Sequence, residues 1–378
     1  MVETAAHLTD HVFPKLPIRQ WVLSVPKRLR YFLQRDVALQ GAVLRIFLGE
    51  VERCLREHSP GCDTQARIGA VAFIHRFGSS LNEHLHFHCC IVDGTFEPVA
   101  NADDGAEVDF HAATVLDRFA IAEVQARVRR RVLATFVRRG LIDKADAEVM
   151  GGWVHGGGFS VNASVCINEK DRTGLERLLR YCARPPFALE HLQQLDAEHL
   201  VYHSPKPGLD GSNDLVLTPL ELIEKIAALV PPPSAHRHRY FGVLAPNSPL
   251  RAAVIAMASV AVAAPSLTLT ESGTEENPRR AVSHYLWAML LARIYEAFPL
   301  SCPICHAQMR IIAFINEAGD VRKILEHIGE SAQPPRIAPA RGPPLWELAE
   351  ASAQAGNDPE WDTAEPAPEI EFDQSVAW

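Results

Sequence analysis

The sequence lacks the features that mark membrane, secreted and repeat proteins. Its longest apolar stretch, residues 252–265, contains Ser259 and is too short to span a bilayer. The first residues include Glu3, His7 and Asp10, where a secretion signal would be apolar. The eight cysteines follow no regular disulfide framework, and no internal repeat is present. We therefore expect a soluble cytoplasmic protein with reduced thiols and no membrane partner.

Lysine and arginine are absent from residues 342–378, which contain nine aspartates and glutamates. These nine account for the formal net charge of −9, because residues 1–341 contain 37 acidic and 37 basic side chains. A proline-rich, acidic segment cannot bury enough apolar surface to fold, so we expect residues 331–378 to be a disordered tail rather than a surface that mimics DNA. The rest of the chain is neutral overall and contains strongly basic segments, so nucleic-acid binding is not excluded.

Helical and strand patterns alternate along the chain. Residues 68–77 and 84–93 are rich in β-branched and aromatic side chains, and a short polar connection separates them, so we expect two neighbouring strands. Residues 27–57 have apolar side chains at helical spacing and predict one helix, or two that break near Gly41. Residues 116–140 predict a helix with an arginine-rich face. Further strands and helices are expected at residues 19–25, 161–168, 174–184, 199–207, 213–230, 281–298, 309–315 and 321–328.

The length suggests two or three domains. We place a first domain at residues 1–230, a basic, helical C-terminal region at 231–330 and the tail at 331–378. The expected fold class is α+β, with an antiparallel sheet flanked by helices in the first domain and a small zinc-knuckle-like element in the second.

Three histidines alternate with apolar residues in the strand predicted at 84–93. On a strand, His84, His86 and His88 project from one face, while Leu85 and Phe87 enter the core. Imidazoles two residues apart can share one divalent ion. The run therefore predicts a metal site, although a surface strand with incidental histidines remains an alternative.

A His-x-His pair on a strand is found in cupins, zinc hydrolases and HUH endonucleases alike. HUH enzymes also need a tyrosine on a helix as the nucleophile. Tyr181 lies in a predicted helix between Arg180 and Arg184, and His86 and His88 supply the histidine pair. A phenol with a pKa near 10 is a weak nucleophile, so the phosphate it attacks must be polarised by a metal and its charge offset by nearby guanidinium groups.

Several longer segments occur together in this chain: HRFGSSLNEHLHFHCCIVDG, LLRYCARPPFA, HLVYH, LTPLELIEKIAALVPPP, HRHRYFGVLAPN, CPICHAQMRIIAFI and FDQSVAW. Together they resemble the insertion sequence 91 family of rolling-circle transposases over nearly the whole length. The resemblance implies an HUH-type nuclease domain in which His86 and His88 bind the catalytic metal and Tyr181 is the nucleophile. His75 stands where another histidine is common in that family.

The chain departs from the family pattern in two places. Two-tyrosine members have a second tyrosine four residues before the first, and here that position is Arg177. The chain therefore resembles single-tyrosine relatives, in which strand transfer needs alternating or paired subunits, as in a homodimer, or a different order of cleavages. A cysteine-rich zinc-binding segment that usually opens family members is also missing before Met1, which leaves a truncated, inactive DNA-binding remnant as an alternative.

The sequence does not identify all the ligands of the two predicted metal sites. The third ligand of the catalytic metal could be Asn82, Glu83, Asp93 or a remote side chain, and we choose His75. A separate zinc knuckle is predicted where CxxC is followed by a histidine, but a tetrahedral structural site needs a fourth ligand. The candidate zinc ligands are Cys302, Cys305 and His306.

The sequence thus predicts a transposase that cleaves and rejoins single-stranded DNA at element ends through a 5′-phosphotyrosine link, with Mg²⁺ or Mn²⁺ as the catalytic ion and Zn²⁺ as a structural one. Arginines in basic segments are the expected DNA contacts, although such a segment can also be a solvated face. A third alternative is an unrelated His-cluster metalloenzyme acting on a small molecule. The candidate DNA-binding residues are Arg129, Arg130, Arg180, Arg184, Arg237 and Arg239.

Overall fold

The computed structural model divides into two compact units, which we describe separately. The sheet unit comprises residues 17–167 and 185–251, and the helical unit comprises residues 1–16, 168–184 and 252–342. The structure describes residues 2–78, 81–99, 107–153, 155–186, 191–204, 212–231, 236, 238–258, 287–295, 302, 305, 307, 309, 315 and 317–332.

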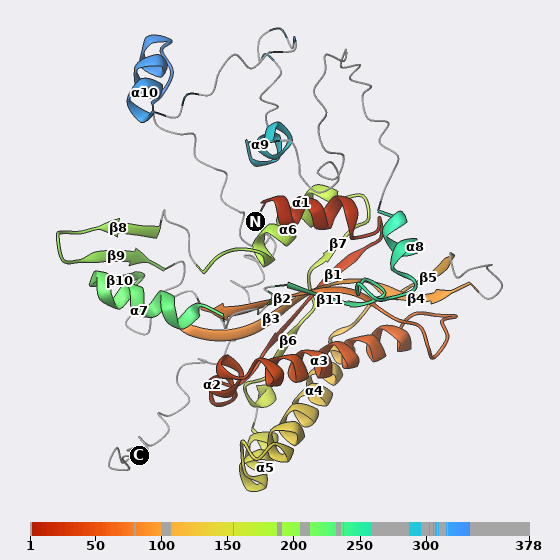
Figure 1. Ribbon diagram of the computed structural model, residues 1–378. Helices are drawn as coiled ribbons and strands as arrows, with labels where there is room; N and C mark the ends of the chain where they lie inside the picture. Colours follow the sequence, from red (N-terminus) through yellow and green to blue (C-terminus); the bar gives the residue numbers. More distant parts are fainter. Residues whose placement is uncertain are drawn as a thin grey trace, which may run out of the picture. The chain divides into compact units, whose positions relative to one another are not determined.

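An antiparallel sheet forms the centre of the sheet unit (Figure 1). Its strands run in the order β11-β2-β3-β1-β6, and the short strand β7 also pairs with β1. The predicted neighbours 68–77 and 84–93 are confirmed as the antiparallel pair β2–β3, with His75 opposite His86. The strands are β1 (Ile18–Ser24), β2 (Gly69–Phe77), β3 (Glu83–Val92), β6 (Ser160–Asn162), β7 (Cys166–Ile167) and β11 (His238–Gly242).

Helices pack on one face of this sheet, which confirms the α+β class. They are α2 (Lys27–Arg35), α3 (Val37–Glu57) and α4 (Arg118–Arg138), and α5 (Lys144–Gly152) packs against α4. The long apolar pattern is divided into two helices, but the break lies at Asp36 and not near Gly41, which is inside α3. Asp36 has extended backbone angles, and its carboxylate accepts a hydrogen bond from Leu39 N at 2.9 Å, so it caps α3 in the way that short acidic side chains favour.

Strand alternation divides the sheet into a face that packs against the helices and a second face, on which the histidines lie among buried apolar side chains such as Val71 and Phe73. Trp21, Leu23 and Phe87 are fully buried in the core formed with α3 and α4. Removing such large side chains from water supplies roughly 2 kcal/mol each, which fixes the register of the strands against the helices. The histidines of β2 and β3 lie on the opposite face.

Two smaller sheets complete the sheet unit. The predicted hairpin and following helix are confirmed in β9 (Leu200–His203), β10 (Asp214–Leu217) and α7 (Pro219–Leu229), and β8 (Leu192–Gln194) pairs with β9. Thr218 caps α7, since its hydroxyl accepts from Glu221 N while the Glu221 carboxylate accepts from Thr218 N. The hairpin of β4 (Gly94–Pro98) and β5 (Val108–Ala112) was not predicted.

The helical unit contains α1 (Val2–His11), α6 (Arg172–Cys182), α9 (Trp287–Tyr295) and α10 (Ala318–His327), and α8 (Arg251–Ala256) begins at its boundary. The helix expected at 321–328 is confirmed as α10, and described residues 287–295 form part of the helix expected at 281–298. Most of the strand expected at 309–315 and nearly all of the 331–378 tail lie outside the described residues. No helix in the described ranges is long and apolar enough to cross a membrane.

Candidate metal centre

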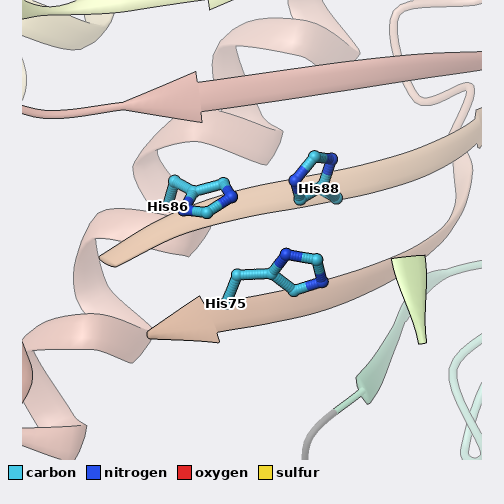
Figure 2. Close-up of side chains that lie close together, drawn as sticks. All are labelled: His75, His86 and His88. Atoms are coloured by element: carbon cyan, nitrogen blue, oxygen red, sulfur yellow. The ribbon is translucent and has the colours of Figure 1, made fainter. Parts of the chain in front are cut away.

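Three histidines converge on the face of the sheet opposite α3 and α4. His75 comes from β2, and His86 and His88 come from β3; Figure 2 shows their three rings next to one another. One ligand atom from each residue lies within 4.8 Å of those from the others. The ring centroid of His75 is 4.4 Å from that of His88 and 5.0 Å from that of His86. We call these three residues the histidine triad, the one group of three such ligands found among the described residues.

The strand register explains why these three meet. His75 stands directly opposite His86, and His88 is two residues further along β3, so all three share one face. His75 and His88 are 3% and 4% exposed, and His86 is half-buried. The site is therefore closed on the side of His75 and His88, and the choice of His75 as the third member agrees with the geometry.

His84 is on the same strand but outside this group. Its ring centroid lies 5.0 Å from that of His86, and its Nδ1 is 3.3 Å from Nη1 of Arg30. Nε of Arg30 donates to the carbonyl of Val25 at 2.7 Å, which fixes the guanidinium. The structure thus places a cation beside the triad where the sequence predicted a fourth histidine ligand.

The hydrogen bond of His86 suits a metal ligand. Nδ1 of His86 is 3.0 Å from the carbonyl of His84. A carbonyl only accepts, so Nδ1 carries the proton and Nε2 keeps a lone pair, which is the form of imidazole that binds a divalent ion. Nδ1 of His88 is 2.9 Å from the amide nitrogen of Gln20, a buried contact. Three neutral imidazoles would suit Mn²⁺, Zn²⁺ or Fe²⁺, which accept nitrogen donors.

The other candidates for a third ligand make different contacts. The two carboxylate oxygens of Asp93 accept from Nε and Nη2 of Arg19 at 2.8 and 2.7 Å. Glu83 is exposed at the start of β3, and the carbonyl of Asn82 accepts from Gly78 N in the connection between β2 and β3. Asp93 and Glu83 are therefore not part of the converging group.

Tyr181 lies on α6 of the helical unit and is half-buried. The guanidinium of Arg184 lies 4.3 Å from the centroid of its ring. The start of α6 is held firmly: Asp171 accepts from Gly174 N at 2.7 Å, and Arg172 donates to the carbonyls of Pro14 and Phe13 at 3.0 Å each. The predicted helix is confirmed, and the role of Tyr181 as nucleophile stays a prediction.

Most of the arginines predicted to contact DNA have partners within the protein. Arg129 donates to the carbonyls of Gly151 and Trp153 at the end of α5 at 2.6 and 3.3 Å, while Arg130 on the same helix is exposed. Arg180 donates to Glu176 and to the carbonyl of Arg293. These contacts stabilise the helices, so DNA binding by Arg129 and Arg180 stays a prediction.

The basic segment before Gly242 is a strand and not a loop. His238 and Tyr240 stand opposite Phe73 and Val71, on the face of the triad, and the centroids of His238 and Phe73 are 6.0 Å apart. Arg239 alternates to the other face, where its Nη1 lies 3.5 Å from the position of a Cβ on Gly41. Arg237 lies outside the described residues.

The predicted zinc knuckle is described only in part. Cys302 N donates to the carbonyl of Ala307 at 2.9 Å, which closes a turn, and Cys305 is exposed. His306 lies outside the described residues, so the zinc site stays a prediction.

Two polar residues near the triad, Gln20 and Arg30, were not predicted. Gln20 is a polar residue between apolar positions of the predicted strand at 19–25, and that is a signal that could have identified it. Arg30 looks like any basic residue of an amphipathic helix, and its contact with His84 depends on the packing of α2 against β3.

Comparison with known proteins gives one match. Residues 69–251 match the model of a protein family described as "Putative transposase". This range includes the histidine triad and Tyr181, and the match is consistent with a transposase. No curated protein and no solved structure matches the chain.

Proposed function

We propose that the chain is a transposase of the HUH type, related to the rolling-circle insertion sequence 91 family, that cleaves and transfers single-stranded DNA. The observation that carries the proposal is the convergence of three imidazoles from adjacent strands within a segment that matches a transposase family. The triad would hold Mg²⁺ or Mn²⁺. When bound, such an ion supplies Lewis-acid polarisation of the scissile phosphate and orients it.

The nucleophile is Tyr181. Its phenol oxygen attacks the phosphorus, the new Oη–P bond forms, and the bond from phosphorus to the 3′ oxygen breaks. The phenol gives up its proton, and the departing 3′ oxygen takes one up, so the products are a 5′-phosphotyrosine and a free 3′-OH. The guanidinium of Arg184 over the ring favours the negative charge that develops on the phenol oxygen.

Arg30 is the proposed phosphate contact. Because its Nε is fixed on the carbonyl of Val25, its terminal nitrogens are presented beside His84 and can donate to a non-bridging phosphate oxygen. A positioned guanidinium of this kind stabilises charge in the transition state without reorganisation. His84 therefore acts through Arg30 and not as a metal ligand.

The test uses labelled single-stranded oligonucleotides from the DNA that flanks the gene, incubated with Mn²⁺ or Mg²⁺ and resolved on a denaturing gel. The wild type is expected to form a slowly migrating covalent adduct that is lost in Tyr181→Phe and His86→Ala. Tyr31→Phe is the matched control, because Tyr31 is also a tyrosine with a guanidinium over its ring: that of Arg35 lies 4.0 Å from the ring centroid. Tyr240→Phe tests a second candidate nucleophile, since Tyr240 lies on the face of the triad.

The other outcomes of this assay identify the alternatives. Salt-dependent DNA binding by the wild type without any adduct would contradict the nuclease and favour a DNA-binding remnant. An adduct that persists in Tyr181→Phe and disappears in Tyr240→Phe would move the nucleophile to β11. Activity on a small molecule that survives Tyr181→Phe would favour an unrelated metalloenzyme.

A further inference from the structure

Gln20 is a buried polar residue of the central sheet. It lies on β1 between Arg19 and the fully buried Trp21, and it is 2% exposed. Its backbone N–H donates to the carbonyl of Val165 at 2.9 Å, so the strand itself does not need the side-chain amide. An amide that is buried without a partner costs free energy, and here the amide nitrogen lies 2.9 Å from Nδ1 of His88.

The strand register accounts for this contact. Gln20 stands opposite Cys90 on β3, and His88, the next residue of β3 on the same face, stands opposite Val22, so the amide of Gln20 reaches His88 diagonally across the strand pair. Both partners are buried, at 2% and 4% exposure, so bulk water does not compete for the hydrogen bond. The position of the amide is therefore set by the sheet and not by a flexible loop.

The two histidines of β3 are oriented by different groups. The partner of His86 Nδ1 is a backbone carbonyl, which can only accept and so permits one tautomer. The partner of His88 Nδ1 is a side-chain amide, which can present either its NH₂ group or its oxygen by turning over. When the amide oxygen faces the ring, Nδ1 carries the proton and Nε2 keeps the lone pair that a metal ion requires.

We infer that Gln20 is a positioning residue that holds His88 in the Nδ1-protonated tautomer and orients its ring for metal binding. This inference rests on the metal site of the proposed function and deepens it. Gln20 does not touch the metal. In the orientation that suits metal binding its amide is turned over, so that the oxygen replaces the nitrogen now 2.9 Å from Nδ1, accepts from His88 Nδ1–H and raises the basicity of Nε2. Groups in this position contribute about 10- to 100-fold to metal affinity.

The test measures Mn²⁺ affinity by calorimetry on the full chain. Gln20→Met keeps the length of the side chain but removes the acceptor, and we expect the dissociation constant to rise by about 10- to 100-fold. Gln20→Glu keeps an acceptor that can face Nδ1–H, and we expect its affinity to stay within about threefold of the wild type. Gln40→Met is the matched control, because Gln40 is also buried and donates to a backbone carbonyl, that of Leu33.

The outcomes separate this inference from the proposed function. A wild type that does not bind Mn²⁺ contradicts the metal site itself. A wild type that binds, together with a Gln20→Met variant of equal affinity, leaves the metal site standing and overturns the role of Gln20. Equal losses in Gln20→Met and Gln40→Met also overturn it, because they would reflect a general loss of packing. Loss in Gln20→Met alone, with rescue in Gln20→Glu, supports it.

Discussion

The ion pair between Arg19 and Asp93 carries our most quantitative prediction. Two parallel hydrogen bonds of 2.8 and 2.7 Å join the guanidinium to the carboxylate, and the side chains are 13% and 9% exposed. Burial by itself lowers the pKa of Arg19, but Asp93 outweighs that effect and raises it. Arg19 also donates to the carbonyl of Ala163 at 3.0 Å, so the pair ties β1 to the segment between β6 and β7.

Asp93→Asn keeps the size of the side chain but removes the charge. The guanidinium of Arg19 then stays largely buried without its counter-ion, and breaking a buried pair in this way costs about 3–5 kcal/mol. In urea unfolding followed by tryptophan fluorescence, we expect the midpoint to fall by about 2 M. Glu123→Gln is the control, since the carboxylate of Glu123 is 60% exposed in its pair with Arg127 and such pairs contribute about 0–1 kcal/mol.

The same variant separates a structural from a metal-binding role for Asp93. We expect the Mn²⁺ affinity of folded Asp93→Asn to equal that of the wild type. Unchanged stability combined with lost Mn²⁺ binding would refute the reasoning, because it would make Asp93 a ligand and not the partner of Arg19.

Three further predictions follow from the site. In calorimetry, His75→Ala should weaken Mn²⁺ binding by at least about 10-fold, while His84→Ala should change it by less than about threefold. The reverse order would place His84 in the triad. Arg30→Ala should slow single-strand cleavage by about 100-fold at unchanged Mn²⁺ affinity, and an unaltered rate would remove Arg30 from the site. Burial and the neighbouring carboxylate of Asp93 raise the pKa of the Cys166 thiol to about 11. Its alkylation at pH 8 should therefore be on the order of 100-fold slower than that of an ordinary thiol, and the alkylation rate should rise as the pH approaches 11.

The sequence predicted the shared face of His86 and His88 well and the position of His75 beside them less firmly. Alternation alone places His86 and His88 on one face, because the side-chain period of a strand is two. Whether His75 joins them depends on the pairing register of β2 with β3, and a shift by one residue would turn it to the other face. That register is set by the connection after Phe77, which includes Leu81 at a φ of 56°, and by an irregularity between His75 and Phe77.

The arginine-rich face of α4 was harder to interpret from the sequence. Two of its arginines pair with acids that lie far away in the chain: Glu50 of α3 pairs with Arg131, and Glu57 pairs with Arg127. No local pattern reveals such partners, since they depend on the packing of α3 against α4. A basic helix face is therefore weak evidence for DNA binding until the packing of its neighbours is known.

The side-chain alternation of strand β11 determines which residues of the 238–242 segment can contact DNA. In a solvated loop, Arg239 could contact a phosphate directly. In strand β11, Arg239 is turned toward α3, and His238 and Tyr240 lie on the face of the triad. DNA bound at the triad should then lose more affinity in Tyr240→Ala and His238→Ala than in Arg239→Ala. Losing a phosphate contact lowers the slope of log affinity against log salt concentration by about one. Because Arg239 faces away from the triad, we expect that slope to stay the same in Arg239→Ala. A reduced slope in Arg239→Ala, measured by fluorescence anisotropy on a single-stranded oligonucleotide, would show that Arg239 reaches the phosphate backbone after all.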